Sequence, residues 1–363
     1  MQQTLVVVGL SMAVVALAIS GVWRRILRLF WISPRRMTVG RLGLAVSDAA
    51  NVDRVNSILV HFVGGFNQML TQPTVDACRR YCDRLPVLFQ PFAHEGVAMG
   101  YTLRHLFRYD AGRFEESLVK VRPDFRYLYY VGLGFWSGMR GHALRRLHRV
   151  TAGLDPMYRY LCYDGYGFKH AFFDYPGDPS RLRRLDGLSG YERNAAYHGV
   201  GRAMFFLFMD RPDLMIDHVA SLGDMAEEAA AGIGLAAVFV NPDRLQLARE
   251  LARAMPARWR PHFHLGMCFG LKARSINNLD QFETDMAEVD EPIRDAVFAS
   301  IRECDRVELL VRSEDRDDGY REWRQRVTAW MTGHIVYPLS EVVPAADRAH
   351  AETEDAMAWG ARR

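Results

Sequence analysis

A small-residue step that recurs along the chain constrains its fold more than any other feature. The clearest copies are Gly132-Leu133-Gly134, Gly165-Tyr166-Gly167, Gly199-Val200-Gly201 and Gly232-Ile233-Gly234. Weaker copies, Gly96-Val97-Ala98 and Gly266-Met267-Cys268, extend the series on both sides. Successive clear copies stand about 33 to 34 residues apart, which is the period of a two-helix repeat. The spacing therefore predicts a series of helical hairpins.

Close packing between helices is the interpretation of these glycines that we favour. A dinucleotide-binding loop needs Gly-x-Gly-x-x-Gly between a strand and a helix, and no copy completes that pattern. Hairpin turns need flanking strands of period two, which are absent from the sequence pattern. A glycine inside a helix costs about 1 kcal/mol relative to alanine. Its repeated use at one register therefore indicates a recurring contact between backbones or a lined cavity.

The periodicity between the glycine steps favours an all-α fold. Residues 75–85, 96–108 and 244–255 and the series from Leu144 to Tyr158 carry apolar side chains every three or four positions, the spacing of a buried helical face. Helix-breaking prolines fall between the repeats, at Pro123, Pro156, Pro212, Pro242 and Pro261. We expect repeats of about 33 to 34 residues to form a curved solenoid or a closed α/α toroid.

The start of the chain has the composition of a membrane anchor. Residues 4–23 form an uncharged, mostly apolar run, long enough to cross a hydrocarbon core as one helix. Five arginines follow up to residue 36 without any acidic residue among them, which favours a cytoplasmic body. Apolar and aromatic residues between those arginines suit a membrane interface. Residues 1–36 are therefore predicted to form a single-pass transmembrane helix and a basic segment beside it.

The rest of the chain is predicted to form one helical repeat domain, residues 37–335, and a disordered tail, residues 336–363. The tail contains few large apolar residues. The net charge of +3 is too small to indicate nucleic acid as a partner. Five cysteines without paired spacing argue against a disulfide framework or a metal site. We expect neither a metal nor a cofactor.

One column of the repeat contains the candidate catalytic residues. Glu95, Asp164 and His198 each stand directly before the first glycine of their copy. If the repeats curve into a ring or a tight solenoid, these groups converge on a cavity lined by aromatic rings. A carboxyl group in such a cavity tends to keep its proton and can act as a general acid. The alternative is that these groups form buried ion pairs, for example with Arg202.

Aromatic and basic side chains near the glycines are the candidates for binding a ligand. They are Tyr130, Trp136, Tyr163, Tyr166, Phe168, His170, Tyr197, Arg202, Phe205, His264 and Lys272. A second acidic cluster, residues 314–318, loosely resembles the metal-diphosphate motif of class I terpene synthases. Its highly charged surroundings favour a solvated helix end instead.

Several motifs resemble a bacterial family of unknown function whose members are described as enediyne biosynthesis proteins. The similar segments include residues 92–99, 131–136, 164–168, 199–206, 232–236 and 262–274, and residues 320–324 are similar to the family's C-terminal signature. The resemblance extends over roughly residues 30–335. It implies a setting in secondary-metabolite biosynthesis without defining a reaction.

Three functions remain open from the sequence. The first is a membrane-associated biosynthesis protein that binds a long apolar polyene or isoprenoid intermediate in an aromatic-lined cavity. The second is an enzyme, a cyclase or isomerase similar to a terpene cyclase, that uses Glu95 or Asp164 as general acid. The third is a helical scaffold that docks partner enzymes. The expected partners are accordingly an apolar small molecule, the membrane through residues 4–23 and the arginines after them, and biosynthetic enzymes.

Overall fold

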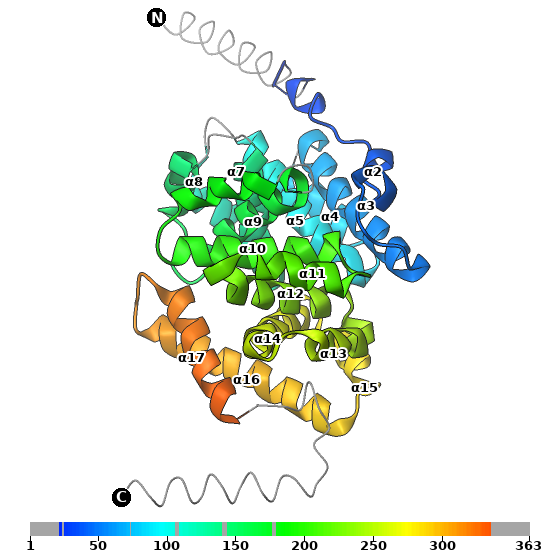
Figure 1. The fold of residues 1–363 in the computed structure, drawn as a ribbon. Coiled ribbons are helices and arrows are strands. Elements are labelled where there is room, and N and C mark those ends of the chain that lie inside the picture. Colours follow the sequence, from blue (N-terminus) through cyan, green and yellow to red (C-terminus); the bar gives the residue numbers. More distant parts are fainter. Residues whose placement is uncertain are drawn as a thin grey trace, which may run out of the picture. The chain divides into compact units, whose positions relative to one another are not determined.

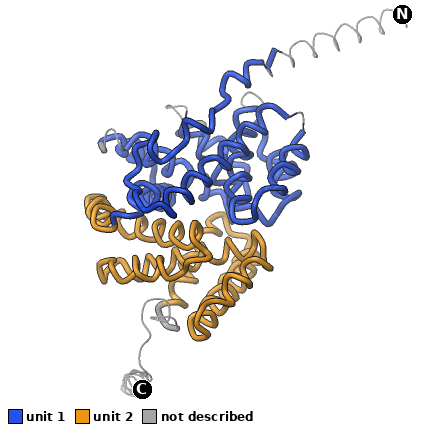
Figure 2. Tube along the Cα trace, turned by 90° about the vertical axis from the view of Figure 1, so that its right-hand side faces the viewer, with its two compact units in different colours: residues 1–211 blue, residues 212–363 orange. Residues whose placement is uncertain are grey.

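The computed structural model describes residues 22–334, except residues 24, 73, 106–108, 140–143 and 176–178. In this part of the chain every regular element is a helix and no strand occurs, so the predicted all-α class is confirmed. The chain divides into two compact units, residues 1–211 and 212–363 (Figure 2). The boundary falls inside the region predicted as one repeat domain.

Five long helices form the framework of unit 1. Each packs against the next in chain order (Figure 1). They are α3 (Ala49–Thr71), α5 (Gln90–Arg104), α7 (Arg126–Met139), α9 (Tyr160–Lys169) and α10 (Tyr191–Leu207). Gly65 of α3, Gly134 of α7 and Gly167 of α9 each meet the backbone of the following long helix. Gly96 of α5 and Gly199 of α10 instead meet the preceding one.

Unit 2 continues the pattern with four long helices. Neighbours again pack in chain order. They are α12 (Ala226–Val240), α14 (Arg260–Asn277), α16 (Glu291–Ser313) and α17 (Gly319–His334).

Shorter elements connect the long helices. The short α-helices are α2 (Val39–Leu42), α4 (Val75–Cys82), α6 (Ala111–Phe114), α8 (Leu144–Thr151), α11 (Pro212–Ala220), α13 (Leu245–Ala254) and α15 (Leu279–Ala287). Two π-helical segments are η3 (Glu115–Val119) and η5 (His170–Asp174). The 3-10 turns are η1 (Pro34–Arg36), η2 (Val87–Phe89), η4 (Pro123–Phe125), η6 (Pro179–Gly187), η7 (Gly223–Met225), η8 (Pro242–Arg244) and η9 (Ala257–Trp259). Prolines thus mark the starts of connecting elements, as the sequence predicts for Pro123, Pro212 and Pro242.

The repeated glycines hold neighbouring long helices in backbone contact, as the packing interpretation predicts. A Cβ on Gly165 or Gly199 would lie closer than 3.0 Å to a carbonyl oxygen of the preceding long helix, a separation that real Cβ atoms essentially never show. The second glycine of a step makes the reciprocal contact with the following helix, Gly134 with Cys162 and Gly167 with Ala196. Only glycine allows this approach on both sides of one helix.

The same contacts show that α9 runs parallel to α7 and that α14 runs parallel to α12. Along α7, Gly134 meets Cys162 of α9, and one turn later Gly138 meets Lys169 of α9. The contacts therefore advance in the same direction on both helices. In unit 2, Gly266 and Gly270 of α14 advance along α12 in the same way. Parallel long helices require a returning connection between them, which the short elements provide.

Hydrogen bonds join the start of α3, the first long helix of unit 1, to the end of α10, the last one. The Ala45 N–H donates to the Leu207 carbonyl over 2.9 Å. The Asp210 carboxylate accepts hydrogen bonds from the Ser47 N–H over 2.6 Å and from the Asn51 side chain over 2.6 Å. The chain just before α3 is thereby tied to the chain at the end of α10.

The prediction of a single-pass membrane protein with a cytoplasmic body is corrected by the structure. None of the helices in the described part of the chain combines the length and the apolar character needed to cross a bilayer. Most of the predicted anchor, residues 4–21, lies outside the described residues. The tail predicted to be disordered, residues 336–363, also lies outside them.

Candidate functional site

Four charged or titratable side chains from three helices of unit 1 meet in its interior. They are Glu95 of α5, Asp164 of α9, and His198 and Arg202 of α10. The Arg202 guanidinium donates a direct hydrogen bond to Asp164, and its Nη2 lies 3.9 Å from Oε1 of Glu95. His198 Nδ1 lies 2.6 Å from the other Asp164 oxygen and donates to it. We call these four residues the interior charge cluster.

The repeat explains why these side chains share one face. Glu95, Asp164 and His198 occupy the position directly before the first glycine of a copy, and Arg202 stands four residues after His198. Positions four apart lie on the same face of a helix, one turn apart. In the copy of α7 between them the column holds Val131. The structure thus brings together all three predicted catalytic candidates and Arg202.

The pKa values of the two carboxyl groups are shifted in opposite directions. Burial raises the pKa of Glu95 to about 7; Arg202 opposes the rise, and the charge of Asp164 adds to it. Burial alone would also raise the pKa of Asp164. Arg202 and His198 outweigh that effect, so the pKa of Asp164 lies below its ordinary value. Near neutral pH, Asp164 is therefore an anion held by two donors, whereas Glu95 exchanges a proton.

Phenylalanine rings cover the face next to the interior charge cluster. The Phe135 ring lies 5.3 Å from Phe62 and 5.8 Å from Phe168, between ring centroids. The Phe168 ring lies 5.9 Å from Phe206. Phe135 and Phe168 occupy the same repeat position as Arg202, whose guanidinium carbon lies 5.2 Å above the Phe168 ring. An apolar face thus continues directly into the charged groups.

The tyrosines two residues ahead of the glycines contact groups on connecting elements or at the start of α10. The Tyr130 hydroxyl donates to Glu115 of η3. The Tyr163 hydroxyl donates to Glu192 over 2.7 Å and lies 3.1 Å from the Thr151 hydroxyl on α8. The Tyr197 ring lies under the Arg193 guanidinium, 5.7 Å away. These predicted binding residues therefore tie the long helices to their surroundings.

The other predicted binding residues of unit 1 form ring contacts. Trp136 lies 6.3 Å from Phe30 and from Phe66, and Phe205 lies 6.0 Å from Phe206. Tyr166 presents its ring to the edge of His170 at 4.6 Å.

A second polar cluster surrounds His170 at the π-helical turn η5, where the sequence indicated only the histidine. His170 Nδ1 lies 2.7 Å from Oδ2 of Asp174, and Lys169 Nζ lies 2.9 Å from the same oxygen. Burial lowers the pKa of His170 to about 4, although the hydrogen bond that its ring donates to Asp174 acts in the opposite direction. The spacing of four residues between His170 and Asp174, beside one of only three lysines in the chain, was the signal that could have found the cluster.

The two remaining predicted binding residues lie in unit 2. Lys272 forms an ion pair with Asp305 of α16. His264 is buried, and burial lowers its pKa to about 4, so that it is neutral near pH 7. The interior charge cluster of unit 1 contains neither residue.

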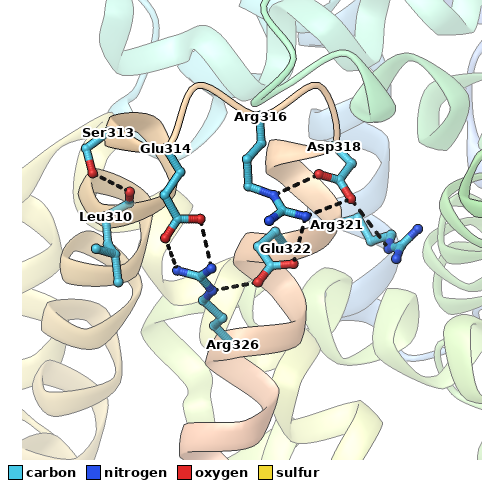
Figure 3. Close-up of polar contacts among 8 residues, drawn as sticks. All are labelled: Leu310, Ser313, Glu314, Arg316, Asp318, Arg321, Glu322 and Arg326. Atoms are coloured by element: carbon cyan, nitrogen blue, oxygen red, sulfur yellow. Dashed lines mark hydrogen bonds and ion pairs between the residues drawn. The ribbon is translucent and has the colours of Figure 1, made fainter.

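The acidic segment near residue 314 is bound by arginines, as Figure 3 shows. Arg326 donates to both oxygens of Glu314, over 2.6 and 2.8 Å. Arg316 donates to Asp318 over 3.0 Å and lies 3.7 Å from Glu322. A metal-diphosphate site needs carboxylates that are free to bind cations, whereas these are neutralised by guanidinium groups. Within the described residues no cluster of three or more His, Cys, Asp or Glu side chains could hold a metal ion.

Comparison with known families identifies the family of the chain but gives it no activity. A family model described as "Protein of unknown function (DUF1702)" matches residues 21–331, and the chain therefore belongs to this family. No curated protein and no solved structure matches it. The description names no reaction, so the enediyne setting implied by the sequence motifs stays a prediction.

Proposed function

We propose that the protein is an acid–base enzyme, an isomerase or cyclase, acting on an apolar unsaturated molecule of the polyene or isoprenoid type. The observation that carries this proposal is the difference in pKa between Glu95 and Asp164 inside one buried cluster. The environment of Glu95 lets it give up and take back a proton near neutral pH, whereas the environment of Asp164 keeps that carboxylate ionised. The motif resemblance to enediyne biosynthesis proteins supports a substrate from secondary metabolism.

Glu95 is the proton donor in this mechanism. Its carboxyl proton moves to one carbon of a substrate double bond, whose π electrons form the new C–H bond, and the neighbouring carbon becomes cationic. The Glu95 carboxylate then takes a proton from an adjacent C–H, which restores the acid and shifts the double bond. In a cyclase, a second double bond attacks the cation before that proton is lost. The step needs no other reactant.

The neighbours of Glu95 have distinct tasks in this mechanism. Arg202 stabilises the carboxylate that remains after proton transfer, because its guanidinium lies 3.9 Å from Oε1. Asp164 and His198 hold Arg202 in place and keep its charge balanced. The faces of Phe135 and Phe168 stabilise a hydrocarbon cation through their π systems.

We infer further that the long helices of unit 1 form a tightly curved array of the solenoid or toroid type. Arg202 of α10 reaches Glu95 of α5, although α7 and α9 intervene in the chain. Phe62 of α3 likewise reaches Phe135 of α7 past α5. Such contacts support inner faces that converge, and the junction of Asp210 with the chain before α3 supports closure.

Metabolite production in the native host tests the catalytic role. Glu95→Gln keeps the size and the hydrogen-bonding groups of the side chain but removes the transferable proton. It should lower product formation roughly a hundredfold while the protein still folds. Glu116→Gln makes the same change on an exposed side chain of η3 and should leave production unchanged. Full production by the folded Glu95→Gln protein would exclude catalysis by this residue.

The protonation of Glu95 can be measured without substrate, independently of any reaction. Infrared difference spectra between wild type and Glu95→Gln at pH 6 should contain a band of a protonated carboxyl group, because the pKa of Glu95 is about 7. Absence of that band would show an ionised Glu95 and would remove the proposed donor.

A further inference from the structure

An arginine-rich segment at the start of unit 1, residues 25–36, is fixed to the helical body by specific contacts. We call it the basic arm. Asn67 of α3 pairs with the backbone of Ile32 on both sides, accepting from its N–H over 3.0 Å and donating to its carbonyl over 2.7 Å. Leu27 is buried, and the Phe30 ring packs edge-on against Trp136 of α7. The arm therefore has a defined face toward the body.

The opposite face of the basic arm exposes large apolar side chains. Leu29 is 82% exposed, Trp31 is 50% exposed and Phe30 is 43% exposed. Ile26 lies on the same segment and is also exposed. Leu29, Trp31 and the part of the Phe30 ring that Trp136 leaves uncovered form a surface that favours contact with another apolar phase.

The basic arm also carries several positive charges. Arg25, Arg28, Arg35 and Arg36 are all exposed, and no ion pair joins any of them to an acidic side chain in the described part of the chain. The sequence contains no acidic residue between positions 24 and 47. The basic arm thus combines exposed apolar side chains with exposed arginines and contains no acidic residue.

We propose that the basic arm binds to the surface of an anionic lipid bilayer, with its exposed leucine and aromatic side chains in the headgroup region. Aromatic and aliphatic side chains interleaved with arginines are the composition of interfacial segments. Each arginine near an anionic surface adds electrostatic attraction. Such a surface contact requires no helix that crosses the bilayer. It is independent of the chemistry proposed for Glu95, although a bilayer is where an apolar substrate would be dissolved.

Vesicle co-sedimentation of the full chain tests this proposal. The probes are vesicles of phosphatidylcholine alone and vesicles that also contain phosphatidylglycerol. The wild type should bind the anionic vesicles more tightly, and added salt should weaken that binding. Leu29→Asp should weaken it at least roughly tenfold, since one apolar contact is lost and a repelled charge is added. The matched control Leu309→Asp, on α16 at 70% exposure, should bind as the wild type does.

A charge variant tests the basic component separately. Arg25→Gln combined with Arg28→Gln should weaken binding to anionic vesicles by roughly thirtyfold and leave phosphatidylcholine binding unchanged. Arg258→Gln with Arg302→Gln removes two exposed arginines from unit 2 and is the control. Equal binding by the arm variants and their controls would overturn the proposal, as would equal binding of the wild type to both kinds of vesicle.

Discussion

The stability of unit 1 should depend on pH through Glu95, and removing this carboxyl group should remove that dependence. The pKa of Glu95 is raised from 4.5 to about 7 because the side chain is buried. A carboxyl group whose folded pKa is raised binds its proton more tightly in the folded state. It therefore contributes most to stability below pH 4.5, and this contribution is lost as the pH rises through 7.

The size of the effect follows from the shift in pKa. One pKa unit corresponds to 1.36 kcal/mol of difference between protonation states. The difference between 4.5 and about 7 thus amounts to about 3 kcal/mol between acid and mildly alkaline solution. Asp164 has the opposite sign, since its pKa is lowered, and its contribution is lost only as the pH falls below its ordinary range.

Denaturant unfolding at a series of pH values from 4.5 to 8.5 measures this dependence. The free energy of unfolding of Glu95→Gln relative to wild type should rise by about 3 kcal/mol across the series, because only the wild type carries the cost of ionising Glu95. The exposed variant Glu116→Gln should run parallel to the wild type. Parallel curves for Glu95→Gln and wild type would refute the assignment of a raised pKa to Glu95, and with it the proposed acid.

Three further substitutions test the packing and the charge balance of unit 1. Gly165→Ala should lower the free energy of unfolding by about 1 to 3 kcal/mol, because the added Cβ meets a backbone carbonyl. Gly40→Ala places its Cβ in open space and should be neutral or stabilising, so equal melting temperatures of the two variants would contradict the contact. Arg202→Met should lower the free energy of unfolding in a denaturant titration by about 3 to 5 kcal/mol, since it leaves a buried carboxylate without its guanidinium partner. A smaller loss of stability than for Arg326→Met at the surface would contradict burial of the pair. Tyr163→Phe should cost about 1 kcal/mol of thermal stability through its lost hydrogen bonds, while product formation by a folded protein should stay unchanged.

The sequence was sufficient to predict the glycine contacts. A glycine at one register of a repeat predicts one kind of contact in every copy, and Gly165 and Gly199 do meet equivalent carbonyls. The helix boundaries were less accessible. The helix predicted to start at Gly96 begins at Gln90. Pro91 occupies its first turn, where no helical hydrogen bond requires the N–H that proline does not have.

Other boundaries depended on local turns that override periodicity. The apolar series from Leu144 to Tyr158 does not form one helix, because α8 ends at Thr151 and a turn containing Gly153 follows. The π-helical turn at His170 also has no periodic signature. It brings Asp174 back onto His170 and Lys169, a contact that depends on backbone winding rather than on spacing alone.

The interior charge cluster shows which part of a site a repeat can predict and which part needs the folded chain. The 33-residue period places Glu95, Asp164 and His198 at equivalent positions, but on separate helices this implies only that they face the same way. Whether they meet depends on how far each helix is rotated against the next, and no single residue encodes that curvature. The approach of Arg202 to Glu95 past two intervening helices is its result. One guanidinium then serves two carboxyl groups, and His198 donates a hydrogen bond to Asp164, so the two acids differ in proton affinity. The proposal of Glu95 rather than Asp164 as proton donor therefore rests on tertiary geometry, because composition and spacing left the choice open.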